Sequence, residues 1–85
     1  MASRVLTDEE KYNICVNNFN GCSIAMLAKT YQVSRDTIVL AIHDVKNSIC
    51  LAYQQGTPTY ILAQNYNTVE AKIVKVLVDY GYMRD

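Results

Sequence analysis

The sequence predicts an all-α protein of about five helices, built from two similar repeats. Apolar residues recur at helical spacing, and an apolar content of 51% with three Gly and one Pro favours an ordered globular chain. The main observation is a set of identical residues spaced 35 positions apart without a gap. These pairs are Ile14 and Ile49, Cys15 and Cys50, Gly21 and Gly56, Leu27 and Leu62, Ala28 and Ala63, Tyr31 and Tyr66, Ile38 and Ile73, Val39 and Val74, and Asp44 and Asp79.

The repeats cover about residues 6–44 and about residues 45–80, and a period of this length is typical of a duplicated supersecondary unit. Each half is near or below the ~40 residues at which a chain usually needs a metal, a disulfide or a partner to stay folded. No low-complexity linker separates the halves. We therefore predict a single compact domain over residues 1–85, in which the two repeats pack on each other.

The first helix is predicted over about residues 8–19. Thr7 and Glu10 have the spacing of a capping box, in which each side chain bonds the backbone N–H of the other residue. Asn20 and Gly21 end the helix, since Gly tolerates a left-handed conformation. The expected buried face consists of Tyr12, Cys15, Val16 and Phe19, with Ile14 beside it.

The second helix is predicted over about residues 23–31, and the third begins after Ser34, a favourable N-cap residue. The third helix should bury Ile38, Ala41 and Ile42. No Gly or Pro occurs between this start and Gly56, so the helix is expected to continue over about residues 35–54 and to be shared by both repeats. Such a helix is about 30 Å long. A kink capped by Asp44, Asn47 or Ser48 is the alternative.

The second repeat continues with two shorter helices. Thr57 is expected to cap the first of them with Pro58 at its first helical position, and this helix should end near Asn65. Thr68 is expected to start the last helix, which should end near Tyr80 at a Gly cap.

The order of residues in the first repeat resembles the helix-turn-helix of resolvases, transposase-like proteins and small phage or bacterial regulators. The residues that carry the resemblance are Gly21, Leu27, Ala28, Tyr31, Val33, Ser34, Thr37 and Ile38. The match covers about residues 6–44, and a weaker one covers about residues 45–80. The resemblance implies a tandem helix-turn-helix protein that binds double-stranded DNA and regulates transcription in a phage or bacterium. It also implies that Ala28 lies where two helices cross closely.

In this family the start of the third helix lies in the major groove and contacts base edges. Carried over to this chain, the contact positions in the first repeat are Ser34, Arg35, Asp36, Thr37 and Leu40, with Lys29 and Thr30 approaching the backbone. Two of these depart from the family pattern: Asp36 repels phosphate unless it accepts from a cytosine amine, and Leu40 stands where relatives often carry a basic residue. The matching positions in the second repeat are Val69, Glu70, Ala71, Lys72 and Lys75, of which only the two lysines favour DNA.

The charge balance supports an alternative function. The chain has eight Lys and Arg against eight Asp and Glu, and neither half is strongly basic. Dedicated nucleic-acid binders usually present a basic face. A protein-binding adaptor or inhibitor that uses the same scaffold without binding DNA fits this balance, as does a homodimer formed through exposed apolar residues such as Val39, Leu40, Val74 and Val78.

No residue pattern indicates an enzyme, a metal or a cofactor. The single His43 and the three cysteines lack the spacing of two to four positions that structural zinc pairs show. An odd number of cysteines within apolar helical patterns fits a reduced, cytoplasmic setting. Residues 1–4 lack a signal-peptide core, and no apolar run approaches the ~20 residues that span a bilayer, so no membrane association is expected.

Overall fold

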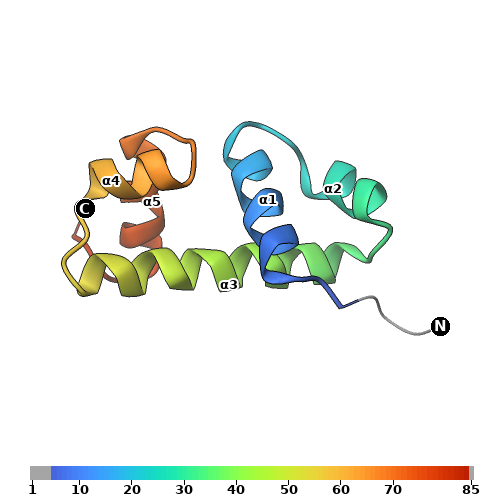
Figure 1. Ribbon diagram of the computed structural model, residues 1–85, viewed down its shortest axis with the longest axis horizontal. Coiled ribbons are helices and arrows are strands. Elements are labelled where there is room, and N and C mark those ends of the chain that lie inside the picture. The colour runs from blue at the N-terminus through green and yellow to red at the C-terminus, as the bar shows by residue number, and fades with distance from the viewer. Residues whose placement is uncertain (1–4, 85) are drawn as a thin grey trace. The chain divides into compact units, whose positions relative to one another are not determined.

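The computed structural model describes residues 5–84, and every regular element in that range is an α-helix (Figure 1). The helices are α1 (Asp8–Phe19), α2 (Ile24–Tyr31), α3 (Arg35–Gln54), α4 (Thr59–Asn65) and α5 (Glu70–Asp79). The predicted all-α class of about five helices is therefore confirmed. Residues 1–4, on which the signal-peptide argument rested, lie outside the described range.

The chain divides into two compact units, Met1–Val45 and Lys46–Asp85, here called unit 1 and unit 2. Unit 1 contains α1, α2 and the first part of α3, and unit 2 contains the rest of α3 together with α4 and α5. Within unit 2, α4 and α5 pack against each other. The packing of the two repeats into one domain stays a prediction.

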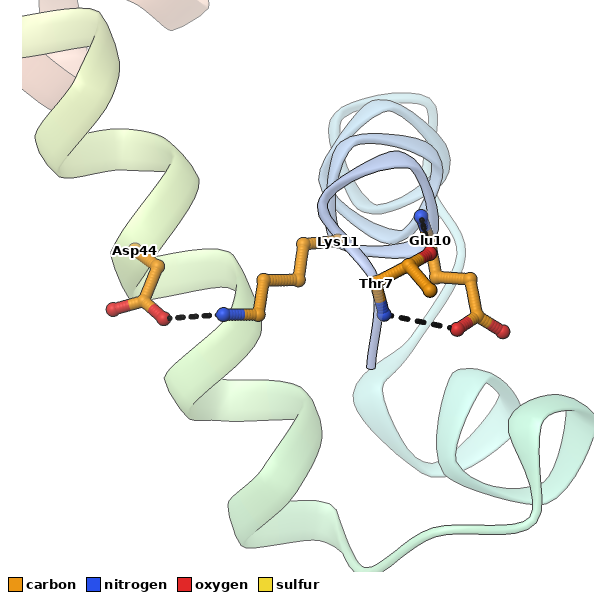
Figure 2. Close-up of polar contacts among 4 residues, drawn as sticks. All are labelled: Thr7, Glu10, Lys11 and Asp44. Carbon is orange, nitrogen blue, oxygen red and sulfur yellow. Dashed lines mark hydrogen bonds and ion pairs between the residues drawn. The ribbon is translucent and has the colours of Figure 1, made fainter. Parts of the chain in front are cut away.

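Helix α1 begins with the predicted capping box. The Glu10 backbone N–H donates to Thr7 Oγ1 at 3.1 Å, and the Thr7 backbone N–H donates to Glu10 Oε1 at 3.0 Å (Figure 2). Two otherwise unpaired donors at the helix start are thereby satisfied. The helix ends at Phe19, Asn20 is its C-cap residue, and Gly21 follows with a φ of 102°. Both predicted ends of α1 are confirmed.

The buried face of α1 is centred differently from the prediction. Ile14 and Cys15 are fully buried and Phe19 nearly so, whereas Val16 is half-buried and Tyr12 is 39% exposed. At 100° per residue, the side chains at positions 14, 15, 18 and 19 form one stripe. Tyr12 lies at the border of this stripe, so its assignment to the core was wrong, and Ile14 belongs to the buried face itself rather than beside it.

The turn between α2 and α3 is short and well bonded. Ser23 caps α2 by accepting from the Met26 backbone N–H at 3.2 Å. The helix ends at Tyr31, and its C-cap residue Gln32 adopts the left-handed conformation with a φ of 56°. The Val33 backbone N–H then donates to the Ala28 carbonyl oxygen at 3.0 Å. Ser34 starts α3 by accepting from the Thr37 backbone N–H at 3.2 Å, as predicted.

Helix α3 is continuous from Arg35 to Gln54, as the lack of a helix breaker predicted. It passes through Asp44, Asn47 and Ser48, the positions considered for a kink. Its buried residues in unit 1 are Ile38, Ala41, Ile42 and Val45, and those in unit 2 are Ile49 and Cys50.

The predicted caps of α4 and α5 were wrong. The residue before α4 is Pro58 and the residue before α5 is Val69, and neither makes a side-chain capping hydrogen bond. The backbone N–H groups of Thr57 and Thr68 donate to Ala52 and Ala63 at 3.0 and 2.9 Å. Each Thr therefore completes the turn that ends the preceding helix rather than starting the next. Helix α5 ends at Asp79, with Tyr80 as its C-cap residue, close to the predicted position.

The sequence period of 35 residues is also a period of the backbone. The hydrogen bond from the Cys22 backbone N–H to the Asn17 carbonyl oxygen has a counterpart 35 positions later, from Thr57 to Ala52. The hydrogen bond from the Val33 backbone N–H to the Ala28 carbonyl oxygen likewise has a counterpart from Thr68 to Ala63. Gln32 and Asn67, which are also 35 apart, are the non-Gly residues of positive φ in the described range. Buried residues recur as well: Ile14 and Ile49, Cys15 and Cys50, Leu27 and Leu62, Ala28 and Ala63, Ile38 and Ile73, Ala41 and Val76, Ile42 and Leu77. The duplication thus preserves the residues that build each unit.

The left-handed residue after α2 yields a first prediction. A side chain in this conformation costs roughly 1–2 kcal/mol, which Gly avoids. Gln32→Gly is expected to raise the free energy of unfolding by about 0.5–1 kcal/mol, and Asn67→Gly by less, because Asn tolerates this conformation. Urea denaturation measures both changes. The control Ala25→Gly, at an exposed position within α2, should lower the free energy of unfolding by about 1 kcal/mol, and a similar loss in Gln32→Gly would contradict the assigned turn.

Candidate nucleic-acid interface

On either side of the turn between α2 and α3, each helix has buried residues and solvent-exposed residues. In α2, Leu27 and Ala28 are buried, which leaves the following Lys29 and Thr30 exposed. In the first part of α3, Ile38, Ala41 and Ile42 are buried, and most of the other side chains are exposed. Four of these exposed residues, here called the α3 face, are Arg35, Asp36, Val39 and Leu40.

The four residues of the α3 face are neighbours on the helix surface. Arg35 and Val39 are four positions apart, as are Asp36 and Leu40, and this spacing brings side chains together. Val39 is 46% exposed and Leu40 is 63% exposed. Arg35 makes no ion pair with any residue in the range 5–84, so its guanidinium is available to an external acceptor.

The hydroxyl groups of Ser34 and Thr37 are bonded to each other at the start of α3. Their oxygen atoms are 2.9 Å apart, and Ser34 Oγ also accepts from the Thr37 backbone N–H. Only one of the two hydroxyl hydrogens is used between them, whichever residue donates. The pair therefore keeps one hydrogen that can be donated outward, for example to a phosphate oxygen.

The segment that carries the α3 face has one more basic than acidic residue, although the chain is neutral. Residues 24–43 contain Lys29 and Arg35 against the single acid Asp36. The next acid along α3, Asp44, forms an ion pair with Lys11 of α1 at 3.1 Å (Figure 2). The pair neutralises that carboxylate and joins α1 to α3 within unit 1, although an exposed pair of this kind contributes little to stability.

The acids of α1 lie on a different element from the α3 face. Asp8, Glu9 and Glu10 all occupy the first turn of α1, where negative charge suits the positive end of the helix dipole. The Glu10 carboxylate accepts from the Thr7 backbone N–H in the capping box. These acids thus have a structural role at the start of α1.

The corresponding positions in unit 2 carry a different charge pattern. Glu70 stands where unit 1 has Arg35, and its Oε1 accepts from Thr59 Oγ1 at 2.9 Å. Lys75 is exposed but forms an ion pair with Asp79 at 3.5 Å, and Lys72 is exposed as well. The start of α5 therefore carries a carboxylate at the position where α3 carries a guanidinium.

The residues predicted to contact DNA divide between the two units. Those on α2, on the turn and at the start of α3 all belong to unit 1, namely Lys29, Thr30, Ser34, Arg35, Asp36, Thr37 and Leu40. Lys72 and Lys75 belong to unit 2. The prediction placed Val39 among the exposed apolar residues but did not name it as a DNA contact. It also missed the Lys11–Asp44 pair, which joins residues 33 positions apart.

The other chemical groups of the chain do not assemble into a site. Within residues 5–84, no three His, Cys, Asp or Glu side chains lie close enough to hold a metal ion. Cys15 and Cys50 are buried, and burial raises the pKa of the Cys50 thiol, which favours its neutral, unreactive form. None of the described helices has both the length and the apolar character needed to cross a bilayer.

Comparison of the chain with protein-family models, with curated proteins and with solved structures finds no match. Function must therefore be inferred from the chemistry of the α3 face. That face combines the guanidinium of Arg35, which recognises paired acceptors, with the carboxylate of Asp36 and two apolar side chains, and the hydroxyl pair of Ser34 and Thr37 lies next to it in the sequence. Such a set suits binding to a surface that offers both acceptors and apolar groups.

Proposed function

We propose that the chain is a small regulatory protein that binds double-stranded DNA, with unit 1 acting as a helix-turn-helix unit. The observation that carries the proposal is the exposed start of α3 directly after the short turn that follows α2. Buried Ala28 and Ile38 fill the inner side of these two helices, while Arg35 and Leu40 face outward. A helix presented in this way brings several side chains to the base edges of the major groove.

Each contact has a defined chemical role in this proposal. Arg35 donates two hydrogen bonds to guanine O6 and N7, the commonest specific contact in the major groove. The Ser34–Thr37 pair donates its remaining hydroxyl hydrogen to a phosphate oxygen. Lys29 and Thr30, at the end of α2, contact the sugar-phosphate backbone. The phosphate contacts set the position of the protein, and the base contacts select the sequence.

Unit 2 has a supporting role in this proposal. Glu70 at the start of α5 opposes phosphate binding there, and Lys75 would have to exchange Asp79 for a phosphate. Unit 2 is therefore proposed to contribute packing or dimerisation, with Lys72 and Lys75 adding weak attraction to the DNA backbone. Regulation of transcription in a phage or bacterium remains the proposed biological setting.

A protein-binding adaptor or inhibitor is the second candidate. Its support is the apolar character of the exposed surface of unit 1, where Leu40 and Met26 are 63% and 57% exposed, together with the zero net charge. Exposed apolar groups of this kind favour protein interfaces when they form a continuous patch. This candidate predicts that binding to the partner is insensitive to Arg35 and lost in Leu40→Asp.

The salt dependence of DNA binding tests the proposal. Fluorescence anisotropy of the full chain with a labelled random-sequence duplex should show binding at low salt. Contacts to two or three phosphates predict that log K falls against log salt with a slope of about −2 to −3. A chain that shows no affinity for duplex DNA at low salt, or an affinity independent of salt, would exclude the proposed function.

A further inference from the structure

Half of the α3 face is apolar, and hydrogen bonding to DNA does not use that half. Val39 and Leu40 are exposed in unit 1, although each lies beside a buried residue of the same helix. Large apolar side chains on a monomer surface are normal when single, but these two are adjacent in the sequence and follow Arg35 and Asp36 by three to five positions. Because both residues belong to the α3 face, which is proposed to contact DNA, we expect them to take part in recognising the DNA sequence.

The major groove offers one apolar group, the 5-methyl of thymine. Leu40 follows Arg35 by five positions, which corresponds to about 7.5 Å along the axis of α3 at 1.5 Å per residue. This distance is roughly two base-pair steps at 3.4 Å each. If α3 lies along the major groove with Arg35 on a guanine, Leu40 can therefore lie near a base pair about two steps away.

We infer that Leu40, with Val39 beside it, selects DNA sites by packing against thymine methyl groups near the guanine that Arg35 contacts. The inference rests on the proposed function and specifies its sequence preference. It accounts for the apolar side chain of Leu40, which stands where proteins of the family that the sequence resembles often carry a basic residue. The preference for thymine does not require a positively charged protein, because contacts to methyl groups do not depend on attraction to phosphates.

The test compares thymine with uracil, which lacks the methyl group. Duplexes are first enriched from a random library with the full chain, and the thymines of the enriched site are then replaced one at a time by deoxyuridine. The affinities of the wild type, Leu40→Ala and Leu51→Ala are measured for each duplex. Leu51 is the matched control, because it lies on the same helix in unit 2 and is 51% exposed.

Removal of the critical methyl is expected to weaken wild-type binding roughly fourfold, the effect of about one buried methyl group. Leu40→Ala should bind the thymine and uracil duplexes almost equally, whereas Leu51→Ala should keep the wild-type difference. Equal binding of both duplexes by the wild type, or an undiminished difference in Leu40→Ala, would overturn the inference while leaving DNA binding intact. Failure to enrich any duplex would instead refute the proposed function itself. Circular dichroism verifies that both variants keep the wild-type helix content.

Discussion

Replacing Arg35 with alanine is expected to weaken binding to the preferred duplex by about tenfold to one-hundredfold. The guanidinium is exposed, makes no ion pair within residues 5–84, and lies in the first turn of α3, next to the Ser34–Thr37 pair. It is the only basic residue of the α3 face, so no neighbour on that face can replace its two hydrogen bonds. Fluorescence anisotropy of wild type and variant measures the loss.

Two controls separate base recognition from simple charge. Arg35→Lys keeps the positive charge but loses the planar pair of donors, so it should retain the affinity for random-sequence DNA and lose most of the preference for the enriched site. Lys46→Ala removes a charge from the same helix in unit 2 and should change the affinity less than threefold, the scale of one phosphate contact. Equal losses in Arg35→Ala and Lys46→Ala would contradict recognition by the α3 face.

The largest effect on stability is expected for Ile38→Ala. Ile38 is fully buried in unit 1, and removal of such a side chain costs about 2–5 kcal/mol through lost burial and a remaining cavity. A chain of 85 residues has a total stability of only about 4–13 kcal/mol. The variant should therefore unfold at a much lower urea concentration, measured by circular dichroism.

The neighbouring Val39→Ala is the control for this substitution. Val39 is partly exposed, so its replacement should cost less than about 1 kcal/mol. Ile73→Ala, at the corresponding buried position of unit 2, should cost about as much as Ile38→Ala, because both side chains are fully buried. An Ile38→Ala variant no less stable than Val39→Ala would contradict the assigned core of unit 1.

Much of the fold could be predicted because the positions at which the helices begin and end depend on local chemistry. The capping box of Thr7 and Glu10, the Ser34 cap and the absence of a breaker before Gly56 each act within a few residues, and all three predictions were confirmed. The predictions for Thr57 and Thr68 were wrong for a related reason. Thr is a favourable residue type for an N-cap, but here the backbone N–H of each Thr donates a hydrogen bond to a carbonyl oxygen of the preceding helix.

The details of the candidate site depended on contacts that the sequence pattern does not reveal. The Lys11–Asp44 pair joins two helices, and the Thr59–Glu70 bond joins α4 to α5. Neither follows from helical periodicity, which describes one helix at a time. The sequence predicted only in part that Val39 is exposed. The exposure of a residue next to buried Ile38 depends on which side of α3 the rest of unit 1 covers.

Backbone amide shifts in a DNA titration test the central claim most directly, since they identify which residues respond to the duplex. The claim is that unit 1 binds DNA through the turn and the start of α3. With unlabelled duplex added to the labelled full chain at low salt, we expect the largest shift changes within residues 29–40 and small changes over residues 70–79. The absence of any shift at low salt, or changes confined to unit 2, would contradict the claim.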